Sequence, residues 1–223
     1  MTNISTKNHD RASAQASLAS RSALTLASFV VLALLLLILV YSANRSRIQA
    51  SQRTLLATSI ADVLPVESID NQPLDDLLLV KHSLLGTTEV MPVYRAWRDN
   101  KPVAAALSVV APDGYSGSIY LLIGISAKGE VTGVRVLEHR ETPGIGDKIE
   151  LSRSNWIMGF NTQSLDKLPA SEWRTTRIGG KFDALTGATI TSSAIIAAVY
   201  DALLWFSLHE GLVFTKAQQL PLQ

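Results

Sequence analysis

The sequence predicts an α+β domain, built as an antiparallel sheet with packed helices and preceded by one N-terminal transmembrane helix. Residues 22–43 run without a charge, and roughly 20 apolar residues are enough to cross a bilayer. Residues 90–139 alternate short apolar runs with polar turns, a pattern typical of strand hairpins. Residues 191–208 carry apolar side chains at helical spacing.

The composition excludes several classes of protein. The 223 residues include 20 Lys and Arg against 19 Asp and Glu, so we expect no basic surface of the kind that binds nucleic acid. The chain has no cysteine, which excludes disulfides, thiolate metal sites, iron–sulfur clusters and a cysteine nucleophile. With only four histidines as well, a metal centre is not expected. If electrons pass through this protein, an organic cofactor must carry them.

The apolar segment at residues 22–43 is expected to be an uncleaved anchor, which leaves residues 1–21 as an N-terminal tail. A signal peptide, the alternative, has an apolar region of about 7–15 residues and small residues at its cleavage site. Tyr41 would stand third before a cut after Ala43, which disfavours cleavage. The positive-inside rule does not set the orientation, because three basic residues precede the span and three follow it: Lys7, Arg11 and Arg21, then Arg45, Arg47 and Arg53.

The segment after the span, residues 44–89, is expected to be a stalk and a connection to a folded domain of residues 90–223. Residues 44–64 favour a helix that continues out of the membrane and stops at Pro65. Residues 66–89 include the Leu-rich run LDDLLLV, and periodicity alone does not decide whether it is helix or strand.

The first half of the domain is expected to form two strand hairpins. Residues 90–98 and 102–110 flank one polar turn, and residues 118–126 and 131–139 flank another. Beyond them, a loop rich in Gly and Pro precedes LSRSNWIMGF, which favours a short helix. The helix of residues 191–208 is the clearest element of the second half.

The residues that point to chemistry lie in DALTGATITSSA, residues 183–194. This loop leads into the N-terminus of the last helix, where free backbone N–H groups and the helix dipole form a natural phosphate site. The alternative is that Thr189 or Thr191 merely caps the helix, since Ser and Thr are ordinary N-caps. Local chemistry alone leaves both interpretations open.

The same loop resembles a known signature. Asp183, Thr186 and the run Gly187-Ala188-Thr189 match the pattern Asp-x-x-(Ser/Thr)-Gly-Ala-Thr of FMN-binding domains that carry covalent flavin. The resemblance implies that a flavin transferase uses FAD and magnesium to join FMN through its phosphate to Thr189, releasing AMP. Gly187 and Ala188 would leave room for the phosphate. Asp183 would serve loop geometry or recognition by the transferase, since a negative charge does not favour a phosphodiester.

Two upstream blocks extend the resemblance. Residues 111–117 (APDGYSG) and 139–148 (HRETPGIGDK) look like signature blocks of the G subunit of the Rnf, or Rsx, electron-transport complex. Ile145 stands where Leu is more usual in that family, a swap of nearly equal volume. The C subunit of the sodium-pumping quinone reductase shares the flavin motif but is generally longer, so the Rnf subunit is the preferred resemblance.

This resemblance implies a flavoprotein subunit that carries electrons on FMN, in a complex that couples electron flow between ferredoxin and NAD to ion translocation. Such a subunit has no complete active site of its own, because the redox chemistry belongs to the cofactor. The family is single-pass in the bacterial inner membrane, which would place residues 1–21 in the cytoplasm and residues 90–223 on the periplasmic side. The expected partners are the other subunits, the flavin transferase and the membrane.

Further flavin contacts are implied at Tyr115, Ser116, His139, Glu141 and Thr142, with Thr191 close to the attachment point. The residues themselves allow a plainer interpretation, in which His139 and Glu141 hydrogen-bond within a Gly-Pro turn and Tyr115 and Ser116 only form a turn. Two other classes of protein are alternatives. A flavin-free, membrane-anchored binding domain would be colourless, and an anchored serine hydrolase would need Ser116 to react with an acyl or fluorophosphonate probe.

Overall fold

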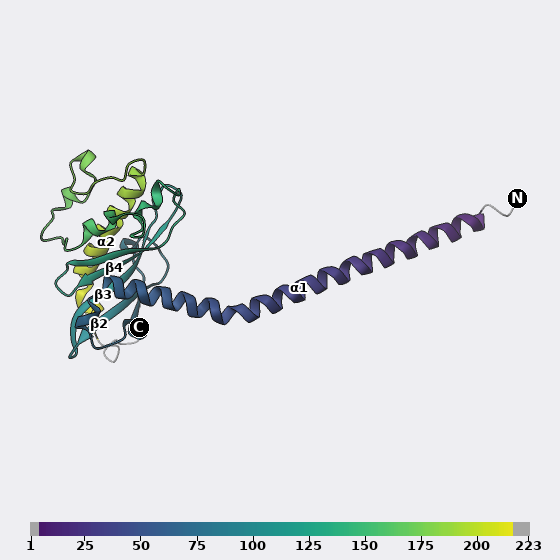
Figure 1. The fold of residues 1–223 in the computed structure, drawn as a ribbon, viewed down its shortest axis with the longest axis horizontal. Helices are drawn as coiled ribbons and strands as arrows, with labels where there is room; N and C mark the ends of the chain where they lie inside the picture. The colour runs from purple at the N-terminus through teal and green to yellow at the C-terminus, as the bar shows by residue number, and fades with distance from the viewer. Residues whose placement is uncertain (1–4, 216–223) are drawn as a thin grey trace. The chain divides into compact units, whose positions relative to one another are not determined.

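The computed structural model describes residues 5–215, and the chain divides into two compact units, Met1–Thr54 and Leu55–Gln223. The first unit is helical, since helix α1 (Ser5–Val63) runs through it and on into the second (Figure 1). The second unit holds one antiparallel sheet and a second long helix, α2 (Thr189–Val213).

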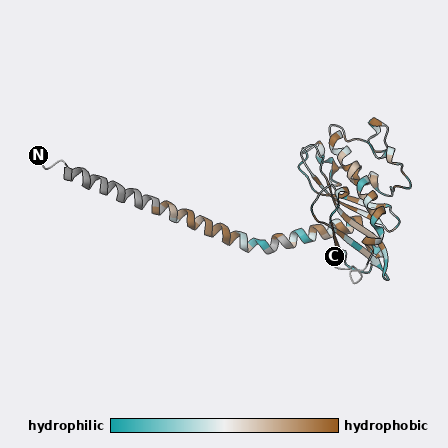
Figure 2. Cartoon of the chain, turned by 180° about the vertical axis from the view of Figure 1, so that it is seen from behind, coloured by the Kyte–Doolittle hydropathy of each residue, from teal (hydrophilic) through white to brown (hydrophobic). Residues whose placement is uncertain are grey.

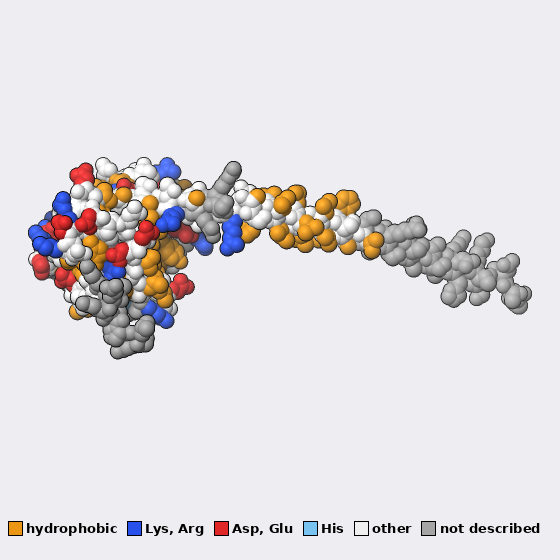
Figure 3. All heavy atoms as spheres, turned by 90° about the horizontal axis from the view of Figure 1, so that it is seen from below, with side chains coloured by type: hydrophobic (Ala, Val, Ile, Leu, Met, Phe, Trp, Pro, Cys, Tyr) orange, Lys and Arg blue, Asp and Glu red, His pale blue; other side chains and the backbone are white. Residues whose placement is uncertain are grey.

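Helix α1 is long and apolar enough to cross a membrane. Its large apolar side chains between Leu24 and Tyr41 are exposed, and Figures 2 and 3 show them as a continuous hydrophobic stretch. The span predicted at residues 22–43 falls on this stretch. Helix α2 passes the same test of length and composition, but 61% of its apolar window is buried, which is typical of the core helix of a globular domain.

The sheet has five strands in the order β1-β2-β3-β4-β5, each antiparallel to its neighbours. The two predicted hairpins are confirmed as the pairs β2–β3 and β4–β5, and so is the α+β fold. The bounds are β1 Leu77–Val80, β2 Met91–Arg98, β3 Lys101–Ala111, β4 Ile119–Ser126 and β5 Val131–Glu138.

Strand β1 and several short 3₁₀ helices occupy segments that the sequence assigned to loops or left open. Strand β1 lies within residues 66–89 and pairs with β2 as a four-residue edge strand. The short helix expected at residues 151–160 is the 3₁₀ helix η5 (Asn155–Phe160). The others are η1 Val66–Ser68, η2 Pro73–Asp75, η3 Ser83–Leu85, η4 Gly146–Ile149, η6 Ala170–Glu172 and η7 Thr176–Ile178.

Two cores lie on opposite faces of the sheet, because successive side chains of a strand point to opposite faces. Helix α2 buries Val199 and Trp205 against the face that includes Leu107. The last turns of α1 bury Ile60 and Val63 in the second, smaller core. The sheet is therefore covered by a helix on each side.

Val63, the last residue of helix α1, lies directly against the sheet. The Thr132 hydroxyl donates a hydrogen bond to the Val63 carbonyl. A Cβ added at Gly124 would lie 2.1 Å from that same carbonyl oxygen. Gly124 pairs with Gly133 across β4 and β5, so two facing glycines provide the space for the helix end.

The folded unit begins earlier than the boundary expected at residue 90. It starts at Leu55, because the end of α1 packs on the sheet and β1 extends the sheet at its edge. The helix does stop ahead of Pro65, as predicted. A sequence pattern cannot separate a free stalk from a packed helix end, since apolar side chains on one face serve both.

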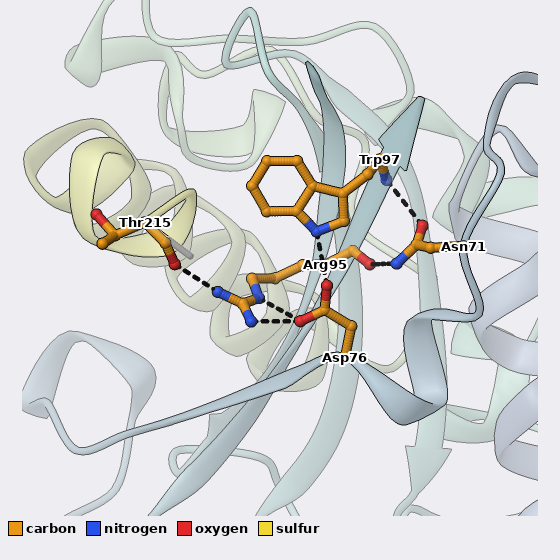
Figure 4. Close-up of polar contacts among 5 residues, drawn as sticks. All are labelled: Asn71, Asp76, Arg95, Trp97 and Thr215. Atoms are coloured by element: carbon orange, nitrogen blue, oxygen red, sulfur yellow. Dashed lines mark hydrogen bonds and ion pairs between the residues drawn. The ribbon is translucent and has the colours of Figure 1, made fainter. Parts of the chain in front are cut away.

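A polar cluster covers the edge of β2 beyond the end of β1 (Figure 4). The guanidinium of Arg95, a residue only 5% exposed, pairs with the Asp76 carboxylate and donates to the Thr215 carbonyl at 2.7 Å. The Trp97 indole N–H donates to the other Asp76 oxygen, also at 2.7 Å. The side chain of Asn71 bonds the backbone of Arg95 and Trp97, where a neighbouring strand would otherwise pair.

Candidate functional site

A cleft of about 530 Å³ opens beside the N-terminus of α2. Its walls come from the β3–β4 loop, the loop after β5, η7 and the loop that carries the signature. The lining residues are Tyr115, Glu141, Thr142, Ile145, Gly146, Arg177, Gly187, Ala188, Thr189, Ile190 and Thr191.

The cleft brings together most of the residues predicted for the site. Those that line it are Tyr115, Glu141, Thr142, Gly187, Ala188, Thr189 and Thr191. Within the part of the chain that the structure describes, Ser116, His139, Asp183 and Thr186 do not line it. Ser116 and His139 contact Glu141 through its carboxylate and its backbone, so they support the wall from outside.

The signature loop is fixed to α2 by a serine. The Ser192 hydroxyl accepts a hydrogen bond from the Leu185 N–H and donates one to the Ala188 carbonyl, both at 3.0 Å. Gly187 has a φ of +84°, a conformation that L side chains rarely adopt. At Ala188, the N-cap, no described side chain caps the helix, so neither Thr189 nor Thr191 has the plain capping role.

The three threonines of the loop differ in what their hydroxyls contact. Thr191 is 0% exposed, and its hydroxyl donates to Glu141 Oε2 at 2.6 Å. Thr186 is exposed outside the cleft. Thr189 is half-buried in the cleft wall, and its Oγ1 accepts a hydrogen bond from Arg177 Nη1 at 3.2 Å. Thr189 therefore combines access from the cleft with a cationic neighbour.

Glu141 ties three segments together at the base of the cleft. Its carboxylate is buried and accepts from the Ser116 N–H at 3.0 Å and from the Thr191 hydroxyl. Two glycines leave it room, since a Cβ at Gly146 would lie 2.8 Å from Glu141 Cβ and one at Gly114 would lie 3.0 Å from Oε1. These bonds use both carboxylate oxygens, which orients the side chain.

His139 lies outside the cleft lining and bonds to the backbone of Glu141. Its Nδ1 accepts from the Glu141 N–H at 3.0 Å, so Nε2 carries the proton that Glu150 Oε1 accepts at 2.7 Å. The hydrogen bond from His139 holds the pKa of the Glu150 carboxyl below its usual value. Because both ring nitrogens are engaged, His139 does not form a base for Ser116, and the described residues give the serine hydrolase alternative no support.

Asp183 lies outside the cleft and holds the loop. Its Oδ1 accepts from the Thr176 hydroxyl at 3.3 Å, and its carbonyl accepts from the Trp156 indole at 2.6 Å. Its side chain is exposed. Of the two roles that the resemblance allowed, the contacts favour loop geometry.

Sequence reasoning missed Arg177, Ile145, Ile190 and Gly146 as lining residues. Arg177 stands six residues before the signature, in a stretch with two other basic residues, Arg174 and Lys181. A basic residue close to a suspected phosphate loop is a signal for such a contact, but that signal does not separate Arg177 from Arg174 and Lys181. The two isoleucines carry no such signal, because isolated exposed apolar side chains are common.

The arrangement suits a ligand with an anionic group and a flat apolar part. The first turn of α2 has backbone N–H groups that lack an acceptor, because no helical turn precedes them. The Arg177 guanidinium lies beside them. At the rim, Tyr115, Ile145 and Ile190 are 69%, 45% and 55% exposed, an apolar surface against which a ring could pack.

Comparison with known proteins identifies the family of this chain. Residues 114–204 match the family model of the FMN-binding domain. The G subunit of the ion-translocating oxidoreductase complex of Pseudoalteromonas atlantica is 37% identical over 90% of this chain and 94% of that protein. The proteins of the same name from Shewanella amazonensis and Vibrio cholerae are 41% and 40% identical, over 88% and 85% of this chain and 92% and 91% of theirs. At this identity and coverage, the chain belongs to the family of the G subunits of ion-translocating oxidoreductase complexes.

Proposed function

We propose that this protein is the flavoprotein subunit of a membrane-bound, ion-translocating electron transport complex, and that it carries electrons on FMN joined by a phosphoester to Thr189. The observation that carries the proposal is the setting of Thr189, which follows Gly187 and Ala188 in the signature and opens into the cleft beside Arg177. Thr191 has its hydroxyl engaged with Glu141, and Thr186 stands outside the cleft.

The cleft fits FMN at both ends of the molecule. The phosphate would lie at the start of α2, against the free N–H groups and the Arg177 guanidinium. The isoalloxazine would lie toward Tyr115, Ile145 and Ile190. FMN supplies the electron transfer itself, and the protein holds the phosphate, orients the ring and sets the polarity around it.

Attachment requires chemistry that this chain does not supply alone. A threonine hydroxyl is a weak nucleophile, so a flavin transferase would provide the base and magnesium. The bond from Thr189 Oγ1 to the flavin-side phosphorus of FAD forms while the phosphoanhydride bond breaks. AMP leaves with the other phosphate, and the hydroxyl proton passes to the base of the transferase.

The place of the subunit in the cell is proposed from the topology that the family resemblance implies. Helix α1 would cross the bacterial inner membrane once through residues 22–43, and residues 1–21 would stay in the cytoplasm. The folded unit would lie on the periplasmic side, where it meets the other subunits and receives its flavin.

The experiment is intact-mass measurement of the protein made with and without the transferase. We expect the wild type to gain the mass of one FMN less one water, and Thr189→Val to gain none, because that change removes the accepting oxygen and keeps the shape. Ser193→Ala is the control, because it removes an exposed hydroxyl four residues later and outside the signature, and it should still gain flavin. Flavin mapped by peptide sequencing to Thr186 or Thr191 would show that the residue assignment is wrong, and a colourless wild type would favour a flavin-free binding domain.

A further inference from the structure

We infer that Arg177 holds the phosphate at Thr189, and that Asp183 acts as a positioning residue that places Arg177 through Thr176. The inference rests on the proposed function and adds two roles to it. Arg177 touches the reacting atom, since its Nη1 donates to Thr189 Oγ1 at 3.2 Å. Asp183 touches Thr176, the residue just before Arg177.

The loop that presents Arg177 is closed on itself. The Thr176 N–H donates to the Phe182 carbonyl at 2.8 Å, and the Gly180 N–H donates to the Thr175 carbonyl at 3.0 Å. Gly180 has no room for a side chain, because a Cβ there would lie 2.0 Å from the Arg174 carbonyl oxygen. The backbone of η7 is therefore held in place, and so is the point from which the Arg177 side chain starts.

Asp183 fastens this closed loop to the signature. Its carboxylate accepts from the Thr176 hydroxyl, and its carbonyl accepts from the Trp156 indole. A carboxylate repels a phosphodiester, so direct contact with the phosphate would be unfavourable. Asp183 therefore affects the phosphate site indirectly, because it sets the position of Arg177.

Arg177 has a role before and after attachment. Before attachment, its hydrogen bond holds the Thr189 hydroxyl, and its positive charge stabilises the oxygen as the proton leaves. After attachment, the phosphodiester carries one negative charge on its two free oxygens. A guanidinium has five N–H donors in a fixed fork, so it can pair with those oxygens.

The test measures how fast purified transferase, with FAD and magnesium, loads flavin onto each variant of the full chain. We expect Arg177→Met to load about tenfold or more slowly, since hydrogen bonds to charged groups contribute about 1.5–3 kcal/mol. Arg177→Lys should recover most of the rate because it keeps the charge. Arg174→Met is the matched control, an exposed arginine three positions earlier, and should load at the wild-type rate.

A double-mutant cycle tests the role of Asp183. Asp183→Ala and Thr176→Val should slow flavin loading by similar factors. The double variant should be no slower than either single variant, because each change removes the same hydrogen bond between Thr176 and Asp183. Asp183→Asn should load normally, since its amide oxygen can still accept from Thr176. If Asp183→Ala loads flavin slowly while Thr176→Val loads it at the wild-type rate, the transferase contacts Asp183 directly. That result would overturn the positioning role.

A second measurement separates this inference from the proposed function. In fully loaded protein, the ³¹P NMR resonance of the phosphodiester should shift in Arg177→Met and stay unchanged in Arg174→Met. If the wild type is loaded at Thr189 but Arg177→Met matches it in rate and in ³¹P resonance, this inference is wrong while the flavin linkage stands. If the wild type gains no flavin at all, the proposed function itself fails.

Discussion

Glu141 joins separate segments of the cleft wall. Its carboxylate joins the β3–β4 loop to the start of α2 through Ser116 and Thr191. Glu141→Ala would leave the buried Thr191 hydroxyl without its acceptor, at a cost of about 1–3 kcal/mol, while the N–H of the exposed Ser116 could bond to water instead. We therefore expect a lower free energy of unfolding, measured with urea.

Glu141→Gln is the matched control, because its amide oxygen keeps one acceptor and its size is unchanged. It should lose less stability than Glu141→Ala. An alanine variant as stable as the wild type would show that the wall does not need this carboxylate, and that its burial is incidental.

The residues of the site differ in how far a sequence can reveal them. The signature predicts Thr189 as the attachment residue, because the pattern consists of residues that are neighbours along the chain. Arg177 and Glu141 reach the cleft from other segments, and their contacts depend on loop closure and on the packing of the β5 loop against α2. Glu141 could be suggested by family resemblance, whereas Arg177 could not be distinguished from nearby basic residues.

The strands and helices differ in the same way. The two hairpins were predictable because alternating apolar residues and polar turns specify them locally. Strand β1 was not, because four residues of Leu and Val form a strand here only through pairing with β2. The packing of the α1 end was also hidden, since it depends on two glycines that face each other across β4 and β5.

The contact between α1 and the sheet can be tested at Gly124. Gly124→Ala would place a Cβ 2.1 Å from the Val63 carbonyl oxygen, so the helix end must move away from the sheet. We expect a loss of about 1–3 kcal/mol, as for other overpacked sites, and faster amide exchange in residues 55–64.

Gly159→Ala is the control for this change, because an added Cβ there would meet no described atom within 4 Å. It should leave both the stability and the exchange pattern unchanged. Gly124→Ala with wild-type exchange in residues 55–64 would contradict the close packing of the α1 end.

For the molecule as a whole, the structure indicates the residue at which a domain able to fold alone begins. The folded unit starts at Leu55, and Ile60, Val63 and Leu64 are buried in its smaller core. Removing residues 1–43 should therefore leave a soluble domain, while removing residues 1–64 takes away one helix that covers the sheet. We expect the second truncation to unfold at a lower temperature or to aggregate, as measured by thermal denaturation.

The shorter truncation also separates flavin attachment from electron transfer. The cleft lies wholly within the folded unit, so the domain without residues 1–43 should still gain FMN when it is exported with the transferase. Electron transfer through the complex should fall, because subunits held in one membrane meet at a high effective concentration that a soluble domain lacks. Colour should remain while activity drops, measured as flavin per protein and as ferredoxin–NAD turnover of membranes. Full turnover with the soluble domain would mean that helix α1 serves only to direct the protein to the membrane, and failure to gain flavin in a folded domain would mean that attachment requires the span.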